Sequence, residues 1–205
     1  HNVLRDCLFD GWNTALRNTI AGGAPLTVYN TEVRNGVAGL GIGGSQGAFI
    51  VGNYSHGHAG AGLGGSGLCS RCIYLYNISA NNTTSGGHGL DVSSASSFPA
   101  SLHNTFYGNT GSGIHIAATT DRFHVGNLST NNTRYGIEDA AGGTTSQDIR
   151  FLNNNAYFSN TLGNYEVAAS AQGPNDTTGV DPSYVNAAGF DWSLGSLLLN
   201  ALGFP

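Results

Sequence analysis

Four ionisable residues recur at roughly equal intervals in this 205-residue chain, and each directly follows a large apolar residue. They are Asp91, His115, Glu138 and Glu166, at steps of 24, 23 and 28 positions. His88 and Tyr135 stand three residues before the first and third of them. If each interval is one turn of a coiled chain, the six side chains share one face. We predict catalytic candidates in Asp91, His115 and Glu138, and ligand contacts from His88, Tyr135 and Glu166.

Carboxylates that flank a histidine can work as general acid and base, because each charge shifts the pKa of its neighbour. Carboxylates about 5 Å apart suit retaining glycoside cleavage, and a gap of about 6.5–9.5 Å suits inversion. With strands about 4.8 Å apart, Asp91 and Glu138 would fall near the upper range. We assign no metal ligands. Asp91, Glu138 and Glu166 could nevertheless hold Ca²⁺, or all could be solvated charges on a sheet face.

A second set of rings could stack against sugar rings, with apolar contact beneath and polar groups beside it. Its members are Tyr29, Tyr74, Tyr76, His103 and His124. Tyr is also common on strands, so ordinary surface packing is the alternative interpretation. Of this set, we predict substrate contacts from Tyr74, Tyr76, His103 and His124.

A repeat positions both sets. In each unit, an Asn or Asp is followed by a small residue nine positions later and by a large residue ten positions later. Only the fourth unit departs from this spacing, by three extra residues. The anchors, 23 to 28 residues apart, are Asp6, Asn30, Asn53, Asn77, Asn104, Asn127 and Asn155. Five residues after an anchor comes a second ladder: Gly11, Asn35, His58, Asn82, Asn109, Asn132 and Asn160. Such a period is typical of stacked coils whose Asn side chains bond to one another at the corners.

Each unit should contain short strands with period-two alternation. Apolar residues two and four positions before the anchor are predicted to face inward, as in Val28 with Leu26 and Val51 with Phe49. The apolar residues after the small one should also point in, as in Leu90 with Val92. The small residue is often Gly, which would supply a backbone angle that other residues resist.

Composition excludes some classes of function. Charged residues make up 9% of the chain, with seven Arg, no Lys and a net charge of -5, so nucleic acid is not an expected partner. No apolar run approaches the roughly 18 residues that span a bilayer. Cys69 and Cys72 form a CxxC without a second pair, so we expect Cys7, Cys69 and Cys72 to be inert or locally paired.

The repeat resembles the right-handed parallel β-helix proteins, the superfamily of pectate lyases, polygalacturonases and phage tailspikes. The segment Asp181-Pro182-Ser183-Tyr184-Val185 and the later Gly189-Phe190-Asp191-Trp192 are similar to the closing segment of secreted bacterial members. The resemblance implies an all-β solenoid of about seven coils in residues 1–173, and a C-terminal flap in residues 174–205 that includes Leu197 to Leu199. Because the first residues already read as a coil, we expect an upstream continuation or a partner that covers it, such as a second copy.

Gly87-His88-Gly89 matches a tripeptide of polygalacturonases, but the Asn-Thr-Asp, Asp-Asp and Arg-Ile-Lys motifs of that family are missing. Two hypotheses therefore stand. The first is an extracellular or cell-surface module that presents a rigid face to polysaccharide or builds a fibre. The second is a polysaccharide lyase or glycoside hydrolase that uses Asp91, His115 and Glu138. Fold alone does not choose between them.

Overall fold

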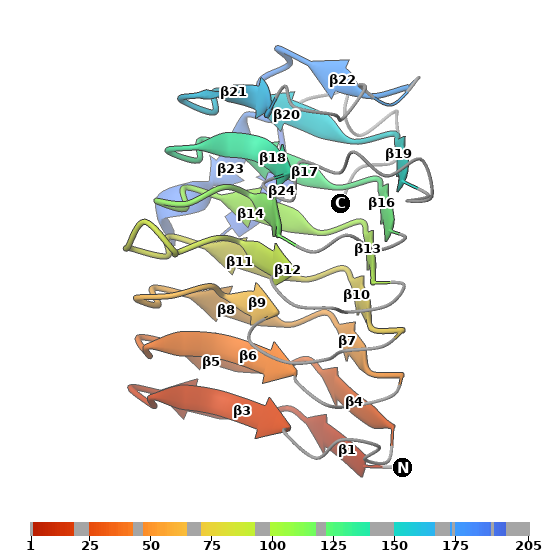
Figure 1. Cartoon of the computed structure of the whole chain (residues 1–205). Coiled ribbons are helices and arrows are strands. Elements are labelled where there is room, and N and C mark those ends of the chain that lie inside the picture. Colours follow the sequence, from red (N-terminus) through yellow and green to blue (C-terminus); the bar gives the residue numbers. More distant parts are fainter. Residues whose placement is uncertain are drawn as a thin grey trace.

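The protein is a parallel β-solenoid, seen in a computed structural model (Figure 1). The structure describes residues 2–18, 25–42, 47–64, 71–92, 99–117, 122–139, 150–166, 173, 175–189 and 191–195. The chain climbs from the N-terminus in stacked coils, and equivalent strands of successive coils pair in parallel. No helix in these ranges has the length and apolar character needed to cross a membrane.

Three parallel sheets form the walls of the tube, and one coil contributes a strand to each. Sheet A contains β1 (Asn2–Arg5), β4 (Leu26–Tyr29), β7 (Phe49–Val51), β10 (Ile73–Leu75), β13 (Ala100–Leu102), β16 (Arg122–Val125) and β19 (Arg150–Asn153). Sheet B contains β2 (Leu8–Asp10), β5 (Glu32–Arg34), β8 (Tyr54–His56), β11 (Ile78–Ala80), β14 (Thr105–Tyr107), β17 (Leu128–Thr130), β20 (Ala156–Phe158) and β22 (Thr177–Thr178). Sheet C contains β3 (Thr14–Asn18), β6 (Ala38–Ile42), β9 (Leu63–Gly64), β12 (Leu90–Val92), β15 (Ile114–Ile116), β18 (Tyr135–Asp139) and β21 (Gly163–Tyr165). The all-β solenoid predicted from the repeat is confirmed.

Buried amides connect the coils at the corner between sheets A and B. The Asn53 side-chain amide donates to Asn77 Oδ1, and the same bond joins Asn77 to Asn104, Asn104 to Asn127 and Asn127 to Asn155, at 2.9–3.0 Å. Each side-chain oxygen also accepts the backbone N–H of the preceding Asn. Because buried polar groups need partners, this Asn ladder fixes the register of neighbouring coils.

A second ladder lies at the corner between sheets B and C. Its amides run from Asn82 through Asn109 and Asn132 to Asn160, at 2.8–2.9 Å. His58 continues this ladder, as predicted, because its backbone N–H donates to Asn82 Oδ1. Its Nδ1 in turn accepts the Gly36 N–H.

In the second coil, both ladder positions were predicted one residue too early. Thr31, not Asn30, donates its N–H to Asn53 Oδ1, and Gly36, not Asn35, precedes His58. Asn30 and Asn35 instead take the left-handed corner position, with φ of 48° and 56°. In later coils the same corner position is filled by residues that precede the ladder Asn, such as Gly52, Tyr76 and His103. Asn tolerates this conformation, which is why the pattern of the second coil looked like the ladder itself.

The inward register of sheet A differs from the prediction in the same way. Val28 pairs with Ile50, so from β7 onward the buried residue lies three positions before the anchor. Ile50 and Tyr74 are buried, whereas Phe49 is 44% exposed. The predicted inward residues of these later strands therefore point outward. In sheet C the prediction is confirmed by the burial of Leu90, Val92, Ile114 and Ile116.

The glycine column of sheet C is explained by close packing. A Cβ at Gly39 would overlap Ser55 Oγ and the Gly62 carbonyl, and one at Gly113 would overlap Ser129 Oγ. Neither glycine has a left-handed φ, so the predicted special backbone angle is wrong here. These serines donate instead to the next glycine carbonyl of the column, as Ser129 Oγ does to Gly136 at 2.8 Å.

The C-terminal segment returns along the outside of sheet B. β23 (Tyr184–Asn186), a short 3-10 helix η1 (Ala187–Gly189) and β24 (Asp191–Leu194) form an antiparallel hairpin. Figure 1 shows it beside the middle coils. Leu194 packs with Leu128 and Ala156, so the hairpin covers a sheet face and not the end of the tube. Phe190 and Leu197 to Leu199 lie outside the described residues.

Candidate functional site

The structure brings the predicted ionisable column together on sheet C. Asp91 pairs with His115, and His115 pairs with Glu138, on the adjacent strands β12, β15 and β18. Glu166 follows on the next coil, since its backbone N–H donates to the Ile137 carbonyl. The preceding residues Leu90, Ile114 and Ile137 are buried in the tube, so Asp91, His115 and Glu138 lie on the opposite, outer side of sheet C.

Asp91 and His115 form a hydrogen-bonded pair. His115 Nδ1 lies 2.9 Å from Asp91 Oδ1, and the two side chains are 17% and 19% exposed. A carboxylate at Nδ1 fixes the ring orientation and, in the neutral imidazole, places the proton on Nδ1. Nε2 then carries the lone pair and bonds to no described residue. This arrangement prepares Nε2 to accept a proton or a hydroxyl hydrogen bond.

His88 supports His115 from the side. The two rings stack at a centroid distance of 4.2 Å and an angle of 9°. The backbone N–H of Ser112 donates to His88 Nδ1 at 3.0 Å, so the proton of neutral His88 sits on Nε2. Burial, followed by the neighbouring His115, lowers the pKa of His88 to about 4. His88 is therefore an uncharged ring at neutral pH.

Glu138 has different partners from those predicted. Its side chain is almost fully buried and accepts hydrogen bonds from Ser112 Oγ and from the Arg134 guanidinium. It therefore joins an ion pair beside the Asp91–His115 pair and makes no hydrogen bond to His115. The roles of Ser112 and Arg134 were missed. The four-residue spacing between Arg134 and Glu138 was the only signal for that pair, and it does not imply contact in an extended strand.

Tyr135 and Glu166 flank this cluster. Tyr135 is partly buried, and its backbone N–H donates to Ser112 Oγ at 3.3 Å. Glu166 is also partly buried, and within the part of the chain that the structure describes its Oε2 has no hydrogen-bond partner. Among the described residues, no three His, Cys, Asp or Glu side chains are placed to hold a metal ion, Asp91, Glu138 and Glu166 included.

Comparison with known families agrees with this architecture. Residues 2–161 match the model described as the right handed beta helix region. The chain belongs to the right-handed β-helix family. No curated protein and no solved structure matches it. The family assignment shows the fold and supports a carbohydrate-related or structural role at most.

The second predicted set of rings does not form one face of the β-helix. Tyr74 and His124 are buried inside sheet A, and His124 Nδ1 lies 2.8 Å from Ser101 Oγ. The shifted register of sheet A turns both side chains inward, so neither can contact an outside ligand. Tyr76 and His103 remain outside, at the corner between sheets A and B, where their rings stack at 5.5 Å.

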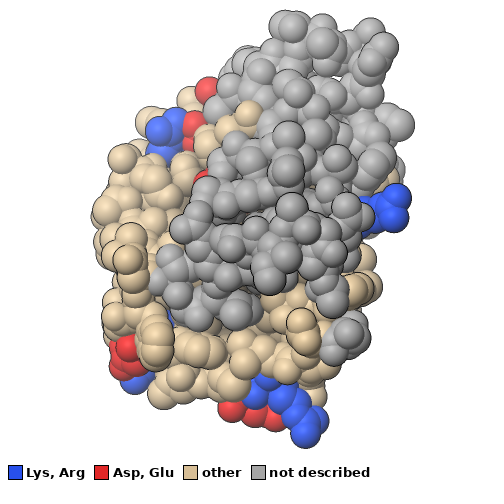
Figure 2. All heavy atoms as spheres, turned by 60° about the horizontal axis from the view of Figure 1, so that its bottom comes forward, with Lys and Arg blue, Asp and Glu red and all other residues tan. Residues whose placement is uncertain are grey.

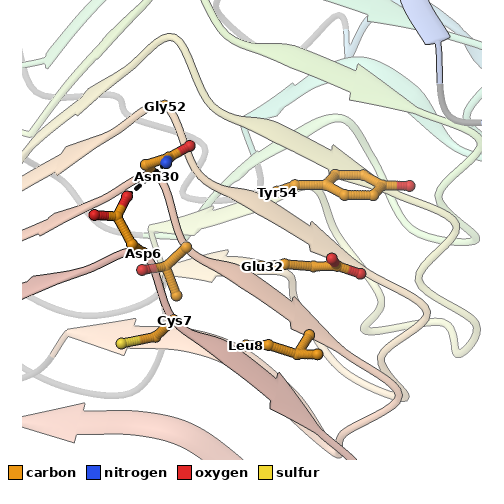
Figure 3. A pocket seen from close by; sticks show the side chains of 8 residues that line it. Asp6, Cys7, Leu8, Asn30, Glu32, Gly52 and Tyr54 are labelled. Atoms are coloured by element: carbon orange, nitrogen blue, oxygen red, sulfur yellow. Dashed lines mark hydrogen bonds between the residues drawn. The ribbon is translucent and has the colours of Figure 1, made fainter.

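A groove of about 410 Å³ runs along the same corner near the N-terminal end of the β-helix (Figure 3). Its wall on sheet B consists of Leu8, Glu32 and Tyr54. Asp6 and Asn30 lie on the corner side, where the Asn30 amide donates to Asp6 Oδ1 at 2.6 Å. Glu32 is bonded to Arg34 and His56. The side chains of Asp6, Asn30 and Glu32 thus already have partners within the protein.

The cysteines divide between two states. Cys72 is disulfide-bonded, whereas Cys7 is free. Cys69 lies outside the described residues.

Proposed function

We propose that this β-helix protein binds a polysaccharide across the outer face of sheet C. The observation that carries the proposal is the Asp91–His115 pair, with His88 stacked beneath it and Tyr135 and Glu166 beside it. Successive strands set these groups about 4.8 Å apart along the tube axis. An extended polymer lying along the axis would meet a new polar group at each coil.

Rigidity favours such binding. The side chains of Asp91, His115, His88 and Glu138 are already held by hydrogen bonds or stacking in the free protein. Binding therefore costs little side-chain entropy, and most of the contact energy appears as affinity. We further propose that the protein acts outside the cell or at its surface, where polysaccharides accumulate. The Cys72 disulfide suits such an oxidising compartment.

A second candidate function is cleavage of the bound polymer. It is favoured by one observation: Asp91 holds His115 through Nδ1, and Nε2 of the same ring bonds to none of the residues that the structure describes. In that position His115 could remove a proton from the sugar or from an attacking water molecule, which are the steps of elimination and hydrolysis. Glu138 is committed to Arg134 and Ser112, so it acts here as a positioning residue.

Equilibrium binding to a panel of soluble polysaccharides tests the first function, using His115→Ala and Asp91→Asn. Loss of the hydrogen bond to Nε2 should weaken binding by about tenfold in His115→Ala. Asp10→Asn, which removes a carboxylate from sheet B, is the matched control and should bind as the wild type does. Equal affinity of all variants would place binding elsewhere.

The same mixtures report cleavage. Ultraviolet absorbance detects unsaturated sugars, and a reducing-end assay detects hydrolysis. Products that form with the wild type and not with His115→Gln would establish catalysis at this residue. If the polymer binds but neither product forms, the cleavage function is rejected and the binding function stands.

A further inference from the structure

We infer that the polysaccharide bound on sheet C carries no carboxylate or sulfate groups. This inference rests on the proposed function and deepens it by naming the chemical class of ligand. It is motivated by the charges of the face and by the positions of the arginines along the chain.

Acidic groups dominate the face. Asp91, Glu138 and Glu166 all project from neighbouring coils, and the only described guanidinium among them, that of Arg134, is bonded to Glu138. His88 adds no positive charge at neutral pH, because burial keeps it unprotonated. Glu166 Oε2 has no hydrogen-bond partner among the described residues. A polymer bearing a carboxylate on each sugar would meet like charge at successive coils, which disfavours that partner.

The rest of the chain offers few compensating cations. It contains seven Arg and no Lys. Arg5 and Arg34 lie beside acidic residues near sheets A and B, away from this column. Arg122 and Arg150 begin strands of sheet A, and Arg17 is three strands from Asp91 along the column. On the face drawn in Figure 2, the described residues present a largely uncharged surface, and their charged side chains form only small groups.

By sequence, Arg71 is the only Lys or Arg in the connections between the strands of sheet C and the strands that follow them. Residues 19–24, 43–46, 65–70, 93–98, 118–121, 140–149 and 167–172 contain neither Lys nor Arg. A bridging divalent cation could in principle reconcile an acidic polymer with an acidic face. However, the described residues include no group of three ligands suited to a metal.

The test compares an uncharged soluble glucan with polygalacturonate in equilibrium binding, in EDTA, at 20 and 500 mM NaCl. We expect the glucan to bind with an affinity that changes less than about twofold with salt, and polygalacturonate not to bind at either concentration. Polygalacturonate binding that weakens with salt, or that appears when CaCl₂ replaces EDTA, would overturn the inference but leave the proposed function standing. Binding of neither polymer would instead refute the proposed function.

Charge reversal tests the physical cause. Glu166→Lys should create polygalacturonate binding, at least about tenfold above the wild-type detection limit at 20 mM NaCl and reduced by salt. Glu32→Lys, the matched reversal on sheet B, should produce no such gain. If Glu166→Lys gains nothing while retaining glucan binding, electrostatic exclusion is not the reason that acidic polymers are rejected.

Discussion

Buried polar residues hold the neighbouring coils of this protein in register. His58 is an instructive member because it occupies a ladder position that Asn fills in later coils. The Gly36 N–H donates to its Nδ1, so its proton lies on Nε2, 3.0 Å from Ser55 Oγ. Ser55 Oγ then donates to the Gly62 carbonyl at 2.7 Å. Protonation of Nδ1 would break the first bond of this chain.

His58 should therefore make stability depend on pH. Burial lowers its pKa to about 4, below the usual value near 6.5. The unfolded state binds the proton more readily, so stability should fall as the pH falls from about 6.5 to about 4. At pH 5 this one group should cost about 2 kcal/mol relative to pH 7. Urea unfolding at pH 7 and pH 5 measures the difference.

His58→Asn provides the comparison. The amide can accept the Gly36 N–H and continue the ladder without a titrating group. We expect the variant to lose about 2 kcal/mol less than the wild type between pH 7 and pH 5. His88, with a similarly lowered pKa, should retain its own share of the pH dependence. Identical pH profiles for the two proteins would contradict this account.

Individual strands show where sequence reasoning succeeded and where it failed. In sheet C, large apolar residues alternate with small or polar ones, so one face could be assigned as buried, and the Asp91–His115–Glu138 column followed. Sheet A carries apolar residues on both faces, as in Phe49-Ile50-Val51. Period-two hydrophobicity then fits either register, and a one-residue shift exchanges the two faces. Moreover, the inner residues Ser101 and His124 are polar and partner each other, which hid the true inner face.

The hydrogen-bond partners of the side chains could not be predicted from the sequence, for a related reason. Strand register placed Glu138 beside His115, but its carboxylate bonds to Ser112 and Arg134. Register fixes which Cα atoms are adjacent and leaves the rotamer of a long side chain open. The choice is made by the nearest cation and hydroxyl group, which only the three-dimensional structure reveals.

Tyr184 helps to hold the C-terminal hairpin against sheet B, together with Leu194. The Tyr184 ring packs edge-on against Tyr107 at 5.4 Å, and its hydroxyl lies 3.1 Å from Thr130 Oγ1. Tyr184→Ala should cost about 3 kcal/mol of hairpin docking, while Tyr184→Phe should cost about 1 kcal/mol. Hydrogen exchange of the β23 and β24 amides should therefore accelerate more in Tyr184→Ala than in Tyr184→Phe. Tyr76→Ala, at a residue 55% exposed, is the control, and unaltered exchange in Tyr184→Ala would contradict the packing described.

The whole molecule is a stack in which each coil contacts chiefly its neighbours, so position along the axis should decide the cost of a substitution. Ile114 is fully buried in a middle coil, whereas Leu4 is partly exposed in the first coil. Ile114→Asp should cost more than about 4 kcal/mol through an unpaired buried charge, and Leu4→Asp clearly less. Ile114→Leu should cost under about 1.5 kcal/mol. Denaturant unfolding followed by far-UV circular dichroism gives all three values, and equal losses for the two Asp variants would contradict the stacking model.

The glycine column has an evolutionary consequence. Because a Cβ at Gly39 or Gly113 would strike the neighbouring coil, these positions admit almost no point variation. An insertion of one residue within a strand would also carry every later side chain to the opposite face. Duplication or loss of an entire turn violates neither constraint, since each turn presents the same ladders to the next. Lineages of this protein should therefore differ in length by complete turns, or by changes between strands, far more readily than by single residues within them.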